Sequence, residues 1–185
     1  MGEAAMRCLR SSGCFVVACT LAASPAGASD HGWSTASDIG RNVLVAAALG
    51  VPAVQGDWAG DLQAGGSILL ARGAAYGLKR IFPEERPDRS DRRSFPSGHA
   101  AVAFAAAATL ENRYGWEAGV PAFIVATFVG ASRVEARKHH WYDVAVGAAI
   151  GTGSGFLLTS KRTAGVRLVP FADSRGGGAS LAMRF

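Results

Sequence analysis

Cysteine is scarce in this 185-residue chain, and its placement is uneven. Cys8, Cys14 and Cys19 all lie near the start, and the sequence has no cysteine beyond them. An internal disulfide framework and a cysteine metal site are therefore excluded for the rest of the chain. The chain is long enough to bury a hydrophobic core without such crosslinks, so the simplest interpretation is a single domain.

Charged residues are scarce as well. They make up 18% of the sequence, against 49% hydrophobic residues, and this composition argues against disorder away from the ends. The formal net charge is +5, a modest excess that favours anionic substrates or peripheral contact with an anionic membrane surface. Such a balance is not typical of nucleic-acid binding, so no nucleic-acid partner is expected.

Residues 1–28 have the pattern of a secretory signal peptide. Arg7 and Arg10 give a basic start, an apolar stretch follows from Cys14, and small residues precede Ala28. We expect cleavage after Ala28, because such a leader is removed on export. The alternative is that the segment stays as a first membrane helix. The remaining chain is then divided into a helical domain over residues 29–160 and a C-terminal tail over residues 161–185.

Long uninterrupted apolar runs are missing too. Helical periodicity predicts an all-α bundle of five to six helices, with helices at residues 39–50, 58–82, 98–113, 121–133 and 141–158. The apolar runs last about 13 to 18 residues where a membrane span needs ~20, so we interpret the helices as buried parts of a soluble or peripheral bundle. The alternative is an integral membrane form, in which polar residues face the bundle interior.

Three smaller expectations concern packing. The tail segments "GVRLVPFA" and "GASLAMRF" flank "DSRGG" and predict a β-hairpin. The tryptophans Trp33, Trp58 and Trp116 are expected to pack in the core or at its rim. The glycines of the second helix are expected to allow close helix packing; they are Gly65, Gly66, Gly73 and Gly77.

Polar residues gather at the ends of the predicted helices, in the segments "KRIFPEERP", "PSGH" and "SRVEARKHHWYD". Lys79, Arg86 and Arg133 are cations able to converge on one anion, and a guanidinium matches the geometry of phosphate oxygens. Ser97 and Gly98 stand where a helix begins. Free backbone N–H groups and the positive end of the helix dipole point outward there, so this helix start can bind an anion.

Two histidines complete a reactive set. His139 and Asp143 are four residues apart, so the carboxylate can hold one ring nitrogen and leave the other nucleophilic. His99 comes from another helix end and would face His139 across the bound anion. One histidine attacks while the other protonates the leaving oxygen, a division suited to phosphoryl transfer. Each motif alone also fits a helix cap or a surface ion pair. The combined order and spacing of the motifs favour a catalytic site.

The combined pattern is K-x6-R-P, P-S-G-H and S-R-x5-H-x3-D, and the sequence has all of its specified positions: Lys79, Arg86, Pro87, Pro96, Ser97, Gly98, His99, Ser132, Arg133, His139 and Asp143. It resembles the type-2 phosphatidic acid phosphatase superfamily, which includes bacterial class A acid phosphatases and vanadium haloperoxidases. The resemblance implies an all-α bundle and no metal or other cofactor. It also implies that a phosphohistidine forms and that water then hydrolyses it.

The resemblance implies a role for each site residue. His139 is the expected nucleophile, Asp143 orients it, and His99 is the general acid and later the base. The phosphoryl oxygens are held by Lys79, Arg86, Ser97, Gly98 and Arg133. Membrane-bound relatives typically have six helices, whereas five are predicted here beyond the leader.

The main hypothesis is therefore a phosphatase of the bacterial envelope, periplasmic and membrane-associated, that acts on a phosphomonoester or diphosphate. A lipid phosphate is favoured as the substrate over a soluble one, since "SFPSGHA" resembles the lipid-directed branch. The alternative is a soluble periplasmic acid phosphatase. A vanadium-dependent haloperoxidase and a non-catalytic envelope protein are the remaining hypotheses.

Overall fold

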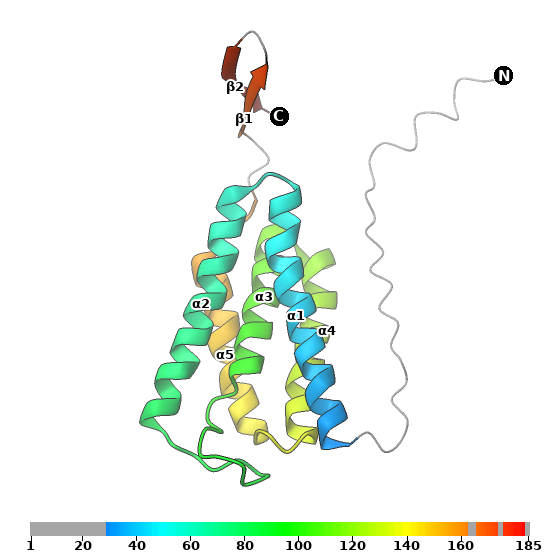
Figure 1. Ribbon diagram of the computed structural model, residues 1–185, viewed down its shortest axis with the longest axis vertical. Helices are drawn as coiled ribbons and strands as arrows, with labels where there is room; N and C mark the ends of the chain where they lie inside the picture. Colours follow the sequence, from blue (N-terminus) through cyan, green and yellow to red (C-terminus); the bar gives the residue numbers. More distant parts are fainter. Residues whose placement is uncertain (1–28, 163–165, 174–175, 184–185) are drawn as a thin grey trace, which may run out of the picture.

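The computed structural model describes residues 29–162, 166–173 and 176–183, so the predicted leader lies outside the described residues. Within these ranges five helices run up and down in one elongated bundle (Figure 1). They are α1 (Asp30–Val54), α2 (Trp58–Ile81), α3 (Gly98–Tyr114), α4 (Trp116–Glu135) and α5 (Trp141–Leu158). The prediction of an all-α bundle is confirmed.

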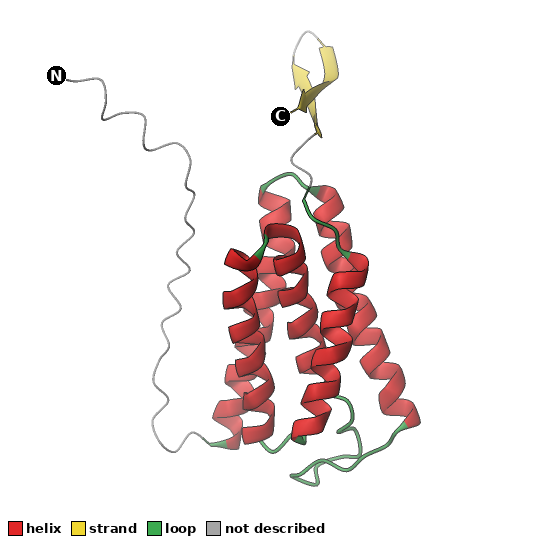
Figure 2. Cartoon of the chain, turned by 180° about the vertical axis from the view of Figure 1, so that it is seen from behind, coloured by secondary structure: helices red, strands yellow, loops and turns green. Residues whose placement is uncertain are grey.

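The C-terminal tail forms the expected hairpin. Strand β1 (Val166–Asp173) pairs antiparallel with β2 (Gly176–Met183), with Val166 opposite Met183. Figure 2 shows these two strands apart from the helices. The helices therefore form the bundle without any contribution from a sheet.

Helix α3 is the centre of the bundle and contacts each of the other four helices. Its middle is almost entirely alanine, and the alanines from Ala100 to Ala108 are fully buried. Alanine has the highest helix propensity, and its small side chain lets neighbouring helices approach closely on every side. An alanine-rich segment can therefore serve as the core of a five-helix bundle.

The closest helix contact joins α5 to α3 through a row of glycines. Gly147, Gly151 and Gly155 lie one turn apart, and a Cβ at any of them would collide with the α3 backbone, including the carbonyl oxygen of Ala101. The predicted packing role of the α2 glycines is wrong. Among the described residues, a Cβ on any of the four predicted glycines meets nothing closer than a leucine side chain, 3.9 Å from Gly66. Gly73 and Gly77 are exposed and Gly65 and Gly66 are half-buried, so none of the four serves a close helix contact in the described part of the chain.

Two predicted boundaries were also wrong. Helix α1 starts at Asp30, capped by Ser29, and continues past Pro52 to Val54. Pro52 lies in the last turn of α1, where it is buried against Gly60 of α2.

Helix α4 begins at Trp116, ahead of the predicted start at Pro121. Gly115 has φ +85°, a left-handed conformation that turns the chain directly from α3 into α4. The intervening loop that the sequence suggested is therefore absent among the described residues.

The distribution of apolar side chains differs from the expectation for a soluble bundle. The interior holds mainly alanine, glycine and serine, while bulky apolar side chains face outward. Trp58, Trp116 and Trp141 are 72%, 71% and 72% exposed, so the predicted packing of Trp58 and Trp116 is wrong. Trp33 does pack, with its ring 6.4 Å from that of Phe128.

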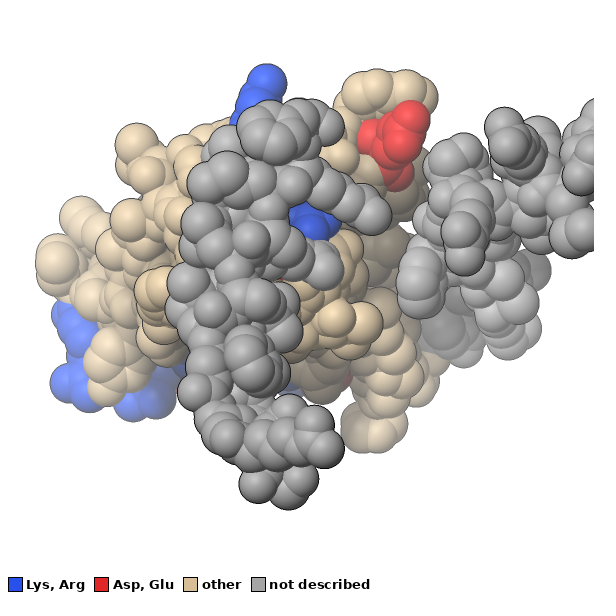
Figure 3. Space-filling model, turned by 90° about the horizontal axis from the view of Figure 1, so that it is seen from above, with Lys and Arg blue, Asp and Glu red and all other residues tan. Residues whose placement is uncertain are grey.

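The end of the bundle nearest the hairpin is also poor in charge. In the view along the bundle from the hairpin end, most of the described atoms belong to uncharged residues (Figure 3). By length and composition, α4 alone among the helices of the described part could cross a membrane.

Candidate active site

Five helix ends meet at the lower end of the bundle in Figure 1: the starts of α1, α3 and α5 and the ends of α2 and α4. A cavity of about 460 Å³ opens there. It is lined by Lys79, Arg86, Gly98, His99, Arg133 and His139, and it continues along α2 past Leu69, Arg72 and Tyr76. Six of the eight predicted site residues therefore share one cavity, although they come from three separate segments.

The other two predicted residues lie directly behind the cavity. Ser97 and Asp143 are both fully buried, and the backbone N–H of Ser97 donates to the carbonyl oxygen of Asp143 at 2.9 Å. This bond joins the start of α3 to the first turn of α5. It fixes the PSGH motif against the segment that carries His139.

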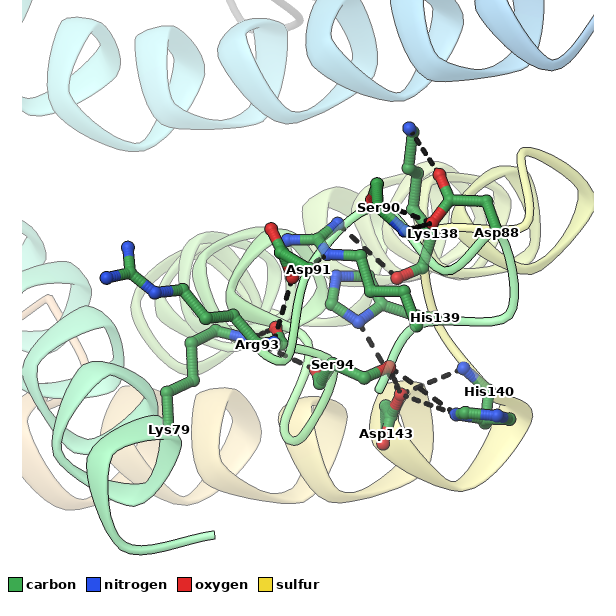
Figure 4. A network of polar contacts seen from close by, with 11 residues as sticks. Lys79, Asp88, Ser90, Asp91, Arg93, Ser94, Lys138, His139, His140 and Asp143 are labelled. Carbon is green, nitrogen blue, oxygen red and sulfur yellow. Dashed lines mark hydrogen bonds and ion pairs between the residues drawn. The ribbon is translucent and has the colours of Figure 1, made fainter. Parts of the chain in front are cut away.

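Asp143 is held by more donors than the sequence suggested. Its Oδ2 accepts hydrogen bonds from the hydroxyl of Ser94 at 2.5 Å and from the backbone N–H of His140 at 2.8 Å (Figure 4). Burial on its own would raise the pKa of Asp143. The nearby ring of His139 and the hydrogen bonds from Ser94 and the backbone of His140 outweigh burial and lower the pKa of Asp143 to about 2. The group is therefore an anion at neutral pH.

His139 lies in the loop two residues before α5, not in the helix itself. Its Nδ1 is 3.6 Å from Oδ2 of Asp143, which is slightly beyond hydrogen-bond length, and Figure 4 shows the ring pointing toward the carboxylate. Burial lowers the pKa of His139, and the facing carboxylate only partly opposes this. Nδ1 is buried against Asp143, so Nε2 is the ring nitrogen that remains for the cavity.

The three cations are held in place by neutral groups and by one carboxylate. Lys79 Nζ donates to the carbonyl oxygens of Arg93 at 2.7 Å and Ser94 at 3.1 Å. Burial, followed by repulsion from Arg86, lowers the pKa of Lys79 to about 8. Arg86 pairs with Asp91 through its Nε at 2.6 Å.

Arg133 is almost completely buried at the end of α4. Its NH1 donates to the hydroxyls of Ser34 and Ser37 on α1, at 3.0 and 3.2 Å. Its Nε is buried and has no hydrogen-bond partner among the described residues. A buried donor without a partner is costly, so this guanidinium is suited to an anion that enters the cavity.

The start of α3 supplies backbone donors. Ser97 is the N-cap, and its hydroxyl accepts from the backbone N–H of Ala100 at 3.4 Å. Gly98 is the first helical residue, and a Cβ placed there would meet nothing within 4 Å among the described residues. Free N–H groups at a helix start favour an anion, and the missing side chain leaves the backbone accessible.

Three residues at the site were missed by the sequence analysis. Ser94 holds Asp143, while Asp38 and Arg41 of α1 each lie 2.7 Å from Nε2 of His99. Burial, and then the charge of Arg133, lowers the pKa of His99 to about 4, although Asp38 opposes this change. The only signal for Ser94 in the sequence was its position, two residues before the PSGH motif. Asp38 and Arg41 are about sixty residues from His99 along the chain, so no local pattern connects them.

One group of side chains in the described part has the spacing of a metal site. The ligand atoms of Glu84, His140 and Asp143 all lie within 4.8 Å of one another. Two of these groups already have partners, because Asp143 accepts from Ser94 and Glu84 accepts from the hydroxyl of Tyr142. These contacts account for the position of both carboxylates.

Comparison with known proteins places this geometry in a family. A lipid A 4'-phosphatase of Helicobacter pylori is 35% identical over 113 residues, which are 55% of this chain and 56% of that protein. A lipid A 1-phosphatase of Porphyromonas gingivalis is 38% identical over 93 residues, 49% of this chain and 21% of that protein. The matched regions thus span little more than half of the first relative and about a fifth of the second.

The fold has a solved counterpart. The crystal structure of Aquifex aeolicus LpxE superposes with a TM-score of 0.60 and 25% identity, over 69% of this chain and 83% of that one. The family model described as PAP2 superfamily matches residues 62–166, more than half of the chain and the whole set of clustered motifs. With the cavity, the three motifs and this match in agreement, the chain belongs to the PAP2 superfamily.

Proposed function

We propose that this protein is a phosphatase that transfers the phosphoryl group of a lipid phosphate to His139 and from there to water. Its family and the phosphatase names of its relatives support the reaction class. The observation that supports it most directly is the shared cavity, in which a buried histidine faces three cationic side chains. Such a cavity is complementary to a phosphoryl group in the transition state, when negative charge develops on the leaving oxygen.

The first step forms a bond from Nε2 of His139 to phosphorus and breaks the bond to the ester oxygen. Asp143 stabilises the positive charge that develops on the ring of His139, because it is a buried anion next to Nδ1. Lys79, Arg86 and Arg133 neutralise the phosphoryl oxygens, and the N–H groups at the start of α3 add further donors. His99 gives its proton to the leaving oxygen, so the alcohol or phosphate departs neutralised.

The second step returns His139 to its free form. A water molecule attacks phosphorus on the side that the leaving group has vacated and gives its proton to His99. The bond between phosphorus and Nε2 breaks, and inorganic phosphate leaves. His99 is thereby protonated again and ready for the next substrate.

A lipid substrate is supported by the shape of the cavity. Beyond the cationic end, the cavity runs along α2, where Leu69, Gly73 and Tyr76 give it a mainly apolar lining. This stretch also includes one charged side chain, that of Arg72. A soluble phosphomonoester has no long apolar group to place in this extension. The apolar part of a lipid would bury surface there, which is favourable. The names of the two curated relatives, both of which are lipid A phosphatases, favour the same substrate class.

The apolar exterior supports a membrane location in which the bundle is embedded in the bilayer. Leu62, Leu69, Ile124 and Leu157 are each more than 60% exposed, which is unfavourable in water and favourable against acyl chains. Trp58 and Trp116 stand at one end of the bundle and Trp141 at the other, as expected for side chains at the two lipid interfaces. The eight predicted site residues lie at helix ends and in loops, outside the segments that would lie within the hydrocarbon.

The leader belongs to the same proposal. Residues 1–28 direct the chain to the envelope and are removed, which leaves Ser29 as the first residue of the mature protein. Mass spectrometry of protein recovered from the membrane fraction measures this directly. An intact leader in the mature protein would contradict cleavage and favour retention as a membrane helix.

The proposed nucleophile is tested with His139→Ala, using phosphate release from a lipid phosphate and from an aryl phosphate. We expect the variant to lose turnover of both, while native protein trapped with radiolabelled substrate carries acid-labile phosphate. His31→Ala is the matched control, because His31 is exposed at the start of α1. Full activity of His139→Ala would overturn the mechanism. Equal catalytic efficiency on soluble and lipid phosphates would instead favour the acid-phosphatase alternative.

Membrane embedding has its own test. Native tryptophan fluorescence is measured in vesicles that contain lipids brominated near the headgroup or deep in the acyl chain. We expect strong quenching, greater for the shallow bromines, because the exposed tryptophans stand near the two ends of the bundle. Extraction of the protein from membranes by alkaline carbonate, with no quenching, would contradict an embedded bundle.

A further inference from the structure

The start of α1 forms a wall of the active site that the family pattern does not describe. The family match covers residues 62–166, whereas Asp38 and Arg41 belong to α1. Both side chains reach the same atom, Nε2 of His99, at 2.7 Å each. They also contact each other, with 3.5 Å between NH2 of Arg41 and Oδ1 of Asp38.

These two contacts require different protonation states of His99. A carboxylate only accepts hydrogen bonds, so the contact with Asp38 needs a proton on Nε2. A guanidinium only donates, so the contact with Arg41 needs a bare Nε2. One nitrogen cannot satisfy both at once, and the two α1 side chains therefore compete for it.

Only one of these states is useful for proton transfer. His99 lines the cavity, and its Nε2 is occupied by α1, so Nδ1 is the nitrogen that remains for the substrate. A histidine that donates from Nδ1 and stays neutral afterwards must keep a proton on Nε2. The contact with Asp38 preserves that proton, as a carboxylate does for a catalytic histidine in general.

We propose that Asp38 is the positioning residue of His99: its carboxylate holds the proton on Nε2, so that Nδ1 donates to the leaving oxygen and later accepts from water. Arg41 stabilises the opposite, unproductive state, in which Nε2 carries no proton. Its hydrogen bond to Nε2 is lost when Nε2 becomes protonated. This inference rests on the proposed function, because it assigns His99 the part of general acid and base.

The surroundings of His99 explain why a carboxylate is needed. The charged groups that face the ring are Asp38 and Arg41 from α1 and Arg133 from α4, of which only Asp38 is an anion. Burial is the largest cause that lowers the pKa of His99, followed by the charge of Arg133. Without Asp38, every remaining neighbour in this set would oppose the protonated ring.

The test compares two substrates whose leaving groups differ in their need for a proton. A p-nitrophenolate leaves without protonation, whereas an alkoxide does not. For Asp38→Asn, we expect kcat/KM for an alkyl phosphate to fall by at least about tenfold, since general acids typically contribute 10²–10⁴. We expect less than about a twofold change for p-nitrophenyl phosphate, because kcat/KM reports only the steps up to the departure of the leaving group.

Two variants serve as controls on the full chain. Asp30→Asn removes an exposed carboxylate about two turns earlier on α1, and it should leave the activity on both substrates unchanged. Asp38→Glu should recover part of the loss, because it restores a carboxylate. Arg41→Gln should shift the pH profile for the alkyl phosphate in the direction opposite to Asp38→Asn, a result that a merely structural role would not produce.

Equal losses on both substrates would mean that Asp38 only shapes the cavity, and that outcome overturns the inference. An unchanged alkyl phosphatase activity overturns it as well. Failure of the proposed function looks different: the native protein would turn over neither substrate, or His139→Ala would remain active, and both proposals would then fall together.

Discussion

Ser94 and Asp143 are joined by a hydrogen bond of 2.5 Å between two fully buried side chains from separate segments of the chain, behind the candidate active-site cavity. Ser94 lies in the loop between α2 and α3, and its backbone N–H is itself bonded to the carbonyl oxygen of Glu84 at 2.9 Å. Its carbonyl oxygen accepts from Lys79. One small residue thus connects the carboxylate behind His139 with a cation at the front of the cavity.

Replacement of Ser94 by alanine tests this connection. A hydrogen bond to a charged group contributes about 1.5–3 kcal/mol, so Ser94→Ala should reduce kcat by roughly ten- to a hundredfold if most of the loss falls on the transition state. The measurement is steady-state phosphate release. Ser90→Ala is the matched control in the same loop, since Ser90 donates only to Asp88. Equal activity of the two variants would contradict a role for Ser94 in orienting Asp143.

For an aryl phosphate, whose leaving group needs no proton from His99, the pH dependence of kcat/KM should be set by His139 and Lys79. Burial lowers the pKa of His139, so its neutral, nucleophilic form persists below the usual value of 6.5 and the acid limb lies below that pH. Lys79, with its pKa lowered to about 8, loses its positive charge as the pH rises through that value. Binding of an anionic substrate should therefore weaken above pH 8.

The variant Lys79→Arg assigns the basic limb, because a guanidinium stays protonated throughout this range. Native protein and variant are measured on the same aryl phosphate, so the titration of the substrate affects both equally. The basic limb of the variant should move to higher pH. An unchanged limb would show that another group is responsible.

The contact between α3 and α5 makes a prediction about stability. Gly151→Ala places a methyl group against the carbonyl oxygen of Ala101 and the backbone nitrogen of Ala105. Overpacking of this kind costs about 1–3 kcal/mol in the free energy of unfolding. Gly153→Ala on the same helix meets no described atom within 4 Å, and it should be neutral or slightly stabilising. Denaturation of both variants in detergent measures the difference, and similar stabilities would contradict the close packing.

The opposite end of the bundle allows stability to be separated from catalysis. Arg113 is buried at the end of α3 and pairs with Asp57, the N-cap of α2. Arg113→Met leaves that carboxylate without its partner, at a cost of about 3 kcal/mol in unfolding free energy. The control for loss of a single positive charge is the same substitution at an exposed arginine, Arg80→Met, whose native side chain contacts Tyr76.

Because Arg113 lies a full helix length from the cavity, KM and the pH profile of folded Arg113→Met should match those of the native protein. A change in either would mean that the two ends of the bundle are coupled. Thermal unfolding and kinetics on the same preparation provide both measurements.

Much of the fold could be predicted because its signals are local. Helix α5 was predicted from Trp141 to Leu158 as observed, since its apolar run and polar start are contiguous in sequence. The residues of the three motifs were also predicted to meet, because each stands at a helix end and antiparallel helices bring such ends together. The helix boundaries at Pro52 and Pro121 could not be predicted, because they depend on what packs against those residues.

The sequence by itself determined which segments are helical and that chemically reactive side chains stand at helix ends. Helix propensity, capping and motif spacing all act within a few residues, so they can be read along the chain. Only the tertiary structure decided which face of each helix is buried. It packed the alanine and glycine surfaces together, turned the bulky apolar side chains outward, and brought Asp38 and Arg41 to His99. These outcomes depend on the shapes of surfaces from distant segments, and no local pattern encodes them.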